Sequence, residues 1–321
     1  VDPYGGKNDL KDKIIRCVGN PDTRFNEDAL RILRALRFAS VYGFSIEENT
    51  SKSIFKNADL LKNIATERVT SEFLKLICGK DAVKILDDYR ETIAVIIPEI
   101  TAMFNFNQNN IHHSYDLWQH TLTALGTIEP KPILRMTMLL HDIGKPSVKT
   151  TDNSGQSHFQ GHQLESKKIA DKILHRLRLP SDFINKTLLL IEYHDVRFNG
   201  SKKLMKKVMN VLGTDLTKQL LEVEYADISA QSEYQREEKL GYLETAKTHL
   251  NEIIKDNECF KLSQLDINGK DVLNLGVKEG RDVGNILDYL LMLVVDANVP
   301  NKKSILISKA KEYIYGNQIN K

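Results

Sequence analysis

The sequence predicts a mainly α-helical protein with a short β segment at its N-terminus. Apolar residues recur at helical spacing in many segments after residue 25. Strand-like alternation is confined to the first 20 residues, where Ile14–Val18 reads IIRCV between turn-forming Gly and Pro residues. No internal repeat or low-complexity tract is visible. Because 321 residues exceed the ~100–200 residues of a usual domain, we expect two or three helical domains.

The predicted helices follow one another along the chain. The first begins at Asn26, which we expect to cap a helix whose apolar face starts at Leu30, with Glu27 and Asp28 in the first turn. A polar break at 105–110 separates two groups of helices. By residue number, helices are predicted at 47–57, 66–78, 80–88 and 90–97 before the break, at 114–128, 132–141, 160–177, 181–194, 201–212, 214–227 and 229–255 after it, and at 281–296 and 302–314 beyond an irregular stretch at 256–275.

Composition and charge limit the classes of function. The hydrophobic fraction is 41% and the formal net charge is +2, so any surface for nucleic acid must be a local patch of Lys and Arg. Cys17, Cys78 and Cys259 are too far apart for a CxxC motif, which predicts a reduced, cytoplasmic chain. The apolar runs are too short to span a bilayer and no signal peptide is visible, so we expect no membrane association.

A set of His and Asp residues predicts a divalent-metal site. The doublet His141-Asp142 ends the apolar run MTMLL, which would carry it into the interior, and Gly144 and Lys145 follow at the end of the helix. Buried polar groups of this kind are costly unless a cation satisfies them. Imidazole and carboxylate suit Mg, Mn, Fe, Co, Ni or Zn, so these ligands do not choose the metal. The remaining candidates, each on or at the end of an apolar helix, are His120, His162, His194 and Asp227. The alternative is a metal-free scaffold with polar interior histidines.

Residues 111–230 resemble the HD superfamily of metal-dependent phosphohydrolases, whose signature is H…HD…D. The resemblance implies that the ligands of one metal are His120, His141, Asp142 and Asp227. It implies a second metal or a phosphate contact for His162 and His194, and a phosphate contact for Lys145. We expect Asp142 and Lys145 to take part in catalysis. His113 and His158 could line the cleft, whereas His175 is expected at the surface.

A second constellation is the segment RFNEDALRILRALRF, which begins at Arg24. Asp28 and Arg31 are three residues apart, so a helix would place both side chains on one face. A carboxylate acceptor beside a guanidinium donor can read the base edges of C and A. The alternative is a surface ion pair.

This segment resembles the neck of bacterial CCA-adding enzymes, the tRNA nucleotidyltransferases. Their EDxxR motif is Glu27–Arg31 here, RxxRF is Arg34–Phe38, and ERxxxE is Glu67–Glu72. The opening residues resemble the end of that family's catalytic head, and Ile267–Leu291 resembles its tail. The resemblance therefore covers essentially the whole chain.

The resemblance implies that Asp28 and Arg31 form a template that selects CTP and ATP. Glu67 and Arg68 would support its geometry, and Arg34 would contact triphosphate or buttress the helix together with Arg37. The tail would hold the acceptor and T arms of tRNA. The implied domains are the remnant of the head at 1–24, the neck and body at 25–110, the HD domain at 111–255 and the tail at 256–321.

One feature of that family is missing before Asp28. Its head carries a DxD pair that holds two metals for nucleotidyl transfer, and Asp9 and Asp12 lack this spacing. We therefore expect this polypeptide to be part of a longer enzyme and not to transfer nucleotides by itself.

Three functions stay open at this point. The first is the neck, HD and tail portion of a tRNA CCA-adding enzyme. The second is a freestanding HD phosphohydrolase acting on nucleotide or cyclic-nucleotide phosphoesters, and the third is a non-catalytic tRNA-binding scaffold. Two lysine clusters are either solvated faces or contacts to tRNA phosphates; they are Lys202, Lys203, Lys206 and Lys207, and Lys302, Lys303, Lys309 and Lys311. The sequence does not predict the oligomeric state.

Overall fold

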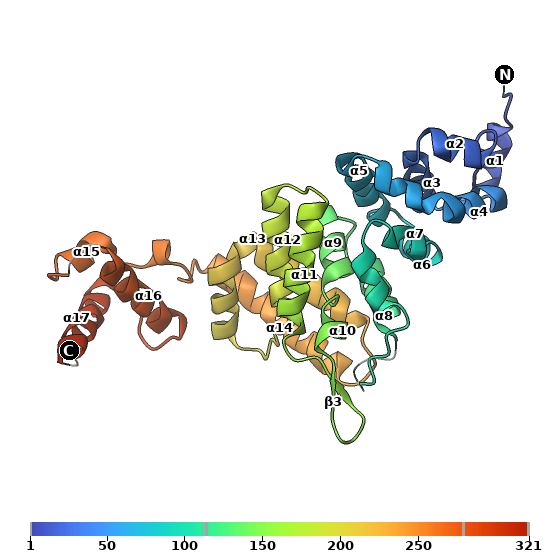
Figure 1. The fold of residues 1–321 in the computed structure, drawn as a ribbon. Helices are drawn as coiled ribbons and strands as arrows, with labels where there is room; N and C mark the ends of the chain where they lie inside the picture. Colours follow the sequence, from blue (N-terminus) through green and yellow to red (C-terminus); the bar gives the residue numbers. More distant parts are fainter. Residues whose placement is uncertain (1, 111, 113–114, 278–279, 320–321) are drawn as a thin grey trace. The chain divides into compact units, whose positions relative to one another are not determined.

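The computed structural model describes residues 2–110, 112, 115–277 and 280–319. Helices make up most of these residues, so the predicted mainly α fold class is confirmed (Figure 1). The chain divides into two compact units, residues 1–196 with 222–237 and residues 197–221 with 238–321. The boundary predicted after residue 110 lies inside the first unit, and that predicted after residue 255 lies inside the second.

The first unit opens with short elements, several of which were not predicted. β1 (Ile14–Ile15) pairs in parallel with β2 (Ser45–Ile46). Helices α1 (Gly6–Asp12) and α2 (Pro21–Glu27) occupy segments where turns were expected. The helix α2 begins where it does because the Asn20 side chain accepts a hydrogen bond from the third backbone amide beyond it and proline occupies the first helical position.

The prediction that a helix begins at Asn26 is wrong. The residues around it end α2, and Asp28 is extended, with φ −152° and ψ 100°. The carboxylate of Asp28 then accepts a hydrogen bond from the backbone amide of Leu30 at 3.1 Å. It therefore satisfies a free amide at the start of α3 (Leu30–Tyr42) instead of lying within a helix.

The rest of the first unit is helical. The apolar face of α3 packs on α5 (Thr66–Ile77). Thr70 on α5 donates to the carbonyl of Leu177 at 2.8 Å, which ties this helix to the residue after α11 (His162–Arg176). The helix α12 (Ser181–Tyr193) packs against both α11 and α9 (Pro132–Leu140). The elements are α4 (Glu48–Asn57), η1 (Ala58–Asn63), α6 (Ala82–Asp88), α7 (Arg90–Ala94), η2 (Pro98–Met103), α8 (Leu117–Thr127), α9 (Pro132–Leu140), α10 (Lys145–Val148), the hairpin of β3 (Thr150–Thr151) and β4 (Ser157–His158), α11 (His162–Arg176) and α12 (Ser181–Tyr193).

The second unit contains most of α13 (Lys202–Ser229) and α14 (Arg236–Lys255). The end of α13, from residue 222, and the first two residues of α14 belong to the first unit. Gly213, with φ 71° and ψ 174°, kinks α13 between the two helices predicted there. The stretch predicted as irregular contains η3 (Leu262–Gln264) and α15 (Gly269–Leu273). A separate apolar core joins α15 to α16 (Arg281–Val295) and α17 (Lys303–Ile319). Among the described residues, no helix is both long and apolar enough to cross a membrane.

Candidate functional site

The structure brings all six predicted metal ligands together in the first unit. The doublet directly follows α9, and the other four come from α8, the start of α11, the end of α12 and the last turn of α13. Their ligand atoms form two sets, each with all atoms within 4.8 Å of one another. One set is His120, His141, Asp142 and Asp227, and the other is Asp142, His162 and His194.

The turn after the doublet needs a glycine. A Cβ added to Gly144 would lie 2.4 Å from the backbone nitrogen of Ser166 and 2.8 Å from the carbonyl oxygen of His162, so a side chain does not fit there. The amide of Gly144 also donates to the Ser166 hydroxyl at 2.9 Å. This close approach of backbone to backbone places Asp142 against the start of α11.

Each of the four histidine rings of the cluster is hydrogen-bonded to a backbone carbonyl on the side away from the other ligands. In each ring the bond involves Nδ1, so Nδ1 carries a proton and Nε2 faces the cluster. The bonds are His141 to Met138 at 2.7 Å, His194 to Ile191 at 2.7 Å, His162 to Phe159 at 2.9 Å and His120 to Ala230 at 3.3 Å.

This arrangement concentrates electron pairs in a buried space. The Nε2 atoms of His162 and His194 lie 3.1 Å apart, and two acceptors at this distance repel each other unless a cation or proton lies between them. Asp142 is 1% exposed and faces both sets, with Oδ2 3.3 Å from His141 Nε2 and Oδ1 3.2 Å from His162 Nε2. The imidazole nitrogens and carboxylate oxygens of the two sets therefore suit divalent cations as ligands. The carboxylate of Asp142 would be shared between the cation of one set and the cation of the other.

Lys145 places an ammonium group beside the Asp142 carboxylate. Its Nζ lies 2.6 Å from Asp142 Oδ2 and 3.1 Å from Oε1 of Gln108. Burial opposes the charge on Asp142, but the nearby Lys145 and His141 outweigh it and hold the pKa of this carboxyl well below its usual range. Burial likewise opposes the charge on His141, but Asp142 and Asp227 raise the pKa of His141 to about 10. Gln108 is 1% exposed and was missed, because the sequence marked its segment only as a polar break.

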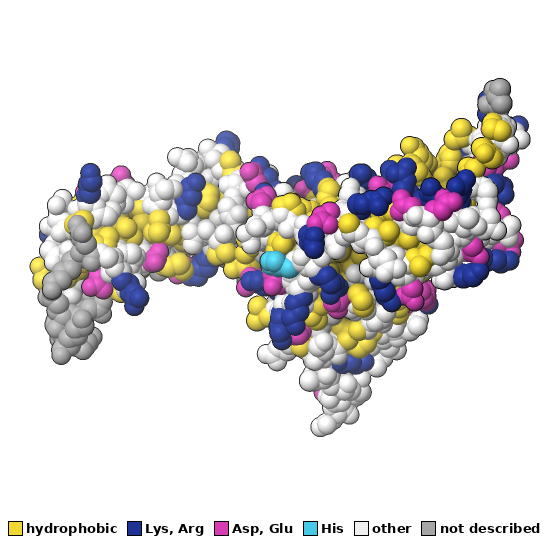
Figure 2. All heavy atoms as spheres, turned by 45° about the horizontal axis from the view of Figure 1, so that its top comes forward, with side chains coloured by type: hydrophobic (Ala, Val, Ile, Leu, Met, Phe, Trp, Pro, Cys, Tyr) yellow, Lys and Arg dark blue, Asp and Glu magenta, His cyan; other side chains and the backbone are white. Residues whose placement is uncertain are grey.

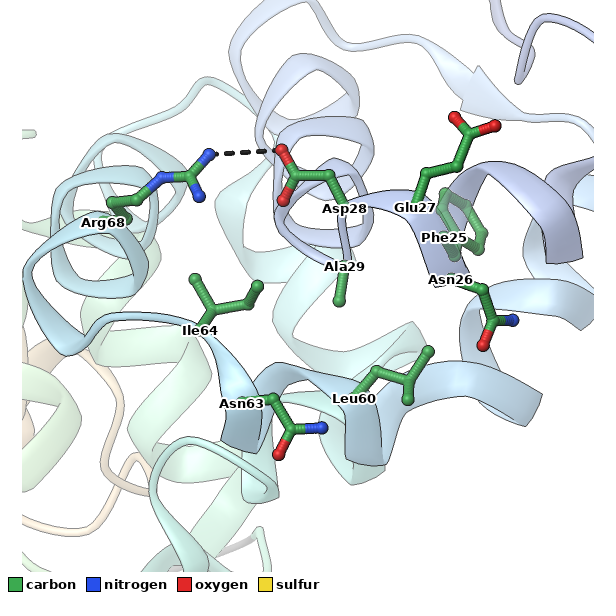
Figure 3. A pocket seen from close by; sticks show the side chains of 9 residues that line it. All are labelled: Phe25, Asn26, Glu27, Asp28, Ala29, Leu60, Asn63, Ile64 and Arg68. Carbon is green, nitrogen blue, oxygen red and sulfur yellow. Dashed lines mark hydrogen bonds and ion pairs between the residues drawn. The ribbon is translucent and has the colours of Figure 1, made fainter.

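A second site is a pocket of about 390 Å³ among α2, α3, η1 and α5 (Figure 3). Figure 3 shows Asp28 and Arg68 directed toward each other, and their Oδ2 and guanidinium nitrogen lie 3.1 Å apart. Half of the Arg68 side chain is exposed, so this pair is accessible to solvent. The lining residues are Phe25, Asn26, Glu27, Asp28, Ala29, Leu60, Asn63, Ile64 and Arg68.

The expectation that Asp28 and Arg31 share one helical face is wrong. Asp28 stands in the extended break before α3, and its partner is Arg68. Arg31 instead pairs with Glu27 at 2.7 Å and donates to the carbonyl of Arg24 at 3.1 Å. The break between α2 and α3 turns the two side chains toward different partners.

The other neck residues are engaged in ion pairs or ring contacts. Glu67 pairs with Arg178 at the end of α11 and does not line the pocket. Glu72 forms a largely buried pair with Arg37, at 2.6 Å. Arg34 lies over the ring of Phe38, its guanidinium carbon 5.6 Å from the ring centre.

Two further histidines have partners outside the cluster. His158 is exposed on the hairpin and pairs with Asp152 at 2.7 Å. His175 is exposed, as predicted, and pairs with Asp171. His113 lies outside the described residues.

The first lysine cluster is paired with acidic residues of the second unit. Lys203 and Lys207 both contact Asp296, at 3.1 and 3.2 Å. Lys202 and Lys206 both contact Glu258, at 2.5 and 2.7 Å. These pairs weaken the case for tRNA phosphate contacts there. In the second cluster, Lys303 pairs with Asp271 at 2.8 Å and Lys309 with Glu312 at 2.6 Å.

Two family models match the chain. Residues 43–104 match the probable RNA- and SrmB-binding site of polymerase A, and residues 162–310 match tRNA nucleotidyltransferase domain 2. Curated relatives include the CCA-adding enzyme of Ligilactobacillus salivarius, 28% identical over 98% of this chain and 67% of its own length. The multifunctional CCA protein of Legionella pneumophila is 30% identical over 65% of this chain and 54% of its own length. The chain thus spans about half to two thirds of these relatives.

Solved structures share the fold. The CCA-adding enzyme of Bacillus stearothermophilus, in complex with CTP, superposes with a TM-score of 0.69 at 22% identity, over 100% of this chain and 70% of that one. The Thermotoga maritima CCA-adding enzyme, in complex with tRNA, gives a TM-score of 0.53 at 19% identity, over 98% of this chain and 67% of that one.

Proposed function

We propose that the chain, which is similar to bacterial CCA-adding enzymes over most of its length, forms the nucleotide-selecting and tRNA-binding part of a cytoplasmic tRNA nucleotidyltransferase. Its substrates would be CTP and ATP, and its partner tRNA. The observation that carries the proposal is the pocket beside Asp28 and Arg68, with Arg31 on the adjoining helix.

Asp28, which lines the pocket, and Arg31, which lies on the adjoining helix, together suit cytosine and adenine. Both bases present an amino donor beside a ring-nitrogen acceptor, which complement the carboxylate of Asp28 and the guanidinium of Arg31. In the present arrangement these groups hold Arg68 and Glu27 instead. Exposed ion pairs contribute little free energy, so an entering base could exchange them at small cost.

Isothermal titration with the four nucleoside triphosphates tests the proposal. We expect CTP and ATP to bind and GTP and UTP to bind more weakly, with Arg31→Ala removing the preference. Arg176→Ala is the matched control, since Arg176 pairs with Glu99 on the surface outside the pocket. If the chain binds neither CTP nor ATP, or if Arg31→Ala leaves their affinities unchanged, the proposal that Asp28 and Arg31 select these nucleotides is wrong.

Our second proposal is a metal-dependent phosphohydrolase activity at the histidine cluster. His120, His141, Asp142 and Asp227 would hold one divalent cation, and His162 and His194 would hold a second together with Asp142. A cation there lowers the pKa of a bound water and neutralises phosphate charge. Lys145 adds a positive charge beside Asp142 for an anionic phosphoester. The relatives are named for nucleotide addition, which favours an accessory activity over a freestanding phosphohydrolase.

This activity is tested with a panel of phosphoesters in the presence of Mn, Co, Ni, Mg or Zn. Nucleoside 2′,3′-cyclic phosphates and nucleoside monophosphates are the expected substrates. Asp142→Ala should abolish turnover, whereas Asp152→Ala, on the exposed hairpin, should leave it unchanged. A protein that binds no divalent metal and hydrolyses no ester of the panel would contradict the proposal.

A further inference from the structure

The exposed face of α3 carries a regular stripe of aromatic and basic side chains. Arg34, Phe38 and Tyr42 recur every four residues and therefore lie on one face of the helix. The helix ends at Gly43, whose φ of 68° turns the chain, and Phe44 follows the turn. We call Arg34, Phe38, Tyr42 and Phe44 the α3 stripe.

The rings of the α3 stripe are stacked or tilted against each other. The ring centres of Phe38 and Tyr42 lie 6.0 Å apart with an angle of 12° between their planes. The centres of Tyr42 and Phe44 lie 5.8 Å apart at 46°. The guanidinium groups of Arg34 and Arg37 lie over Phe38, at 5.6 and 4.0 Å from the ring centre. The stripe thus combines flat apolar surfaces with positive charge.

Little of the described chain covers this surface. Tyr42 is 57% exposed and its neighbour Val41 is 37% exposed. Arg34 forms no ion pair with another described residue, whereas Arg37 is held by Glu72. Figure 2 shows Lys and Arg side chains, with Asp and Glu between them, beside hydrophobic ones over the N-terminal part of the first unit. Exposed apolar surface that is rimmed by charge marks a place where a partner binds.

We propose that the α3 stripe stacks the unpaired bases at the 3′ end of a tRNA. Aromatic rings beside arginines bind single-stranded RNA because bases stack on the rings and the guanidinium attracts phosphate. Arg31 lies on the same helix, and 11 residues of helix span about 16 Å between it and Tyr42, a length that suits a few unpaired nucleotides. The match to an RNA-binding family model, residues 43–104, includes Phe44, and the other three residues of the stripe directly precede it. This inference rests on the proposed function, which makes tRNA the partner.

Fluorescence anisotropy on the full chain tests this with two labelled acceptor-stem RNAs. One carries an unpaired 3′ tail and the other ends blunt. Tyr42→Ala should weaken binding of the tailed RNA by ~5- to 150-fold, the range for loss of one stacked base, and leave the blunt RNA unchanged. Tyr42→Phe keeps the ring and should bind like the wild type. Tyr242→Ala, which removes an exposed tyrosine of the second unit, is the matched control.

The outcomes separate the two proposals. If the wild type binds neither RNA, the proposed function fails and the stacking surface with it. If the wild type binds but Tyr42→Ala leaves affinity for the tailed RNA unchanged, or weakens both RNAs equally, only the stacking surface is overturned. Light scattering that shows a wild-type dimer lost in Tyr42→Ala would likewise overturn it, since the stripe would then bind a second copy of the chain.

Discussion

The histidine cluster and the pocket lined by Asp28 and Arg68 both carry clear sequence motifs. They differ in how firmly the fold holds their side chains in place. In the cluster, five of the six ligand residues are buried, the side chain of Asp227 is 15% exposed, and each imidazole is hydrogen-bonded to a backbone carbonyl. In the pocket, Asp28 and Arg31 are partly exposed and held by other charged side chains. The first site is therefore organised before any ligand binds, whereas the second must exchange partners when a base enters.

The difference follows from desolvation. A buried set of acceptors cannot be satisfied by water, so it needs a cation and is sensitive to the loss of any one member. Exposed ion pairs are screened and can be replaced by water or by a ligand at small cost. Substitutions in the buried site should therefore have larger effects than substitutions in the exposed one.

The largest effect is expected at Asp142, which both ligand sets share. Asp142→Ala should lower metal affinity by at least ~100-fold and empty both positions, because second-sphere changes alone already cost 10–100-fold. His194→Ala should empty only the position it shares with His162. Metal content after dialysis, measured by mass spectrometry, distinguishes the two variants. Full metal retention by Asp142→Ala would contradict the proposal that the Asp142 carboxylate binds both cations.

The two glutamates of the ERxxxE motif provide a matched pair in one helix. Glu72→Ala should lower the free energy of unfolding by about 3 kcal/mol, because it leaves the charge of Arg37 uncompensated where only 16% of that side chain is exposed. Glu67→Ala breaks an exposed pair with Arg178 and should cause no measurable change. Urea unfolding of both variants measures the difference. Equal losses would contradict the distinction between buried and exposed pairs.

A smaller effect is expected at Arg68. Arg68→Ala frees the carboxylate of Asp28 but leaves it in place, since the amide of Leu30 still donates to it. Affinity for CTP and ATP should therefore fall by about fivefold at most. Titration beside Lys62→Ala, whose side chain lies on the surface of η1, provides the control. A loss of 100-fold would show that the exposed pair is as rigid as the buried cluster.

The smallest effect concerns Asp22, which links α2 to α4. Hydrogen bonds from Lys56, Ser53 and Asn57 lower the pKa of Asp22 from its ordinary value to about 2. A folded-state pKa below the unfolded one stabilises the fold above pH ~4, and this contribution disappears as the pH falls toward 2. The urea midpoint of Asp22→Asn should therefore be lower than that of the wild type at pH 5 and converge with it near pH 2. A difference that is independent of pH would contradict this origin.

Sequence reasoning succeeded where the motif and the fold coincide. The six predicted metal ligands lie at or near the ends of helices and close to one another in the interior of the first unit. The apolar run before His141 and Asp142 predicted that this doublet would be buried. Their role as ligands stays a prediction. The resemblance of the neck also located the pocket, since Glu27, Asp28 and Arg68 line it.

Sequence reasoning failed where a helix boundary decided the geometry. Asn20-Pro21 is a helix-start signal that was interpreted as a turn. Recognising it would have predicted the short helix α2 (Pro21–Glu27), which ends before Asp28. Gln108 could not be predicted, because its contact with Lys145 joins residues 37 positions apart through the loop after η2.

The sequence by itself determined the helical class, the order of the candidate ligands and the resemblance to CCA-adding enzymes, because apolar periodicity and short motifs are local properties of the chain. Only the tertiary structure decided which groups face one another. It directed Asp28 to Arg68 instead of Arg31, and it placed Asp142 between two sets of histidines. Such pairings depend on helix ends and close backbone approaches, as at Gly144, and these are set by packing between distant segments.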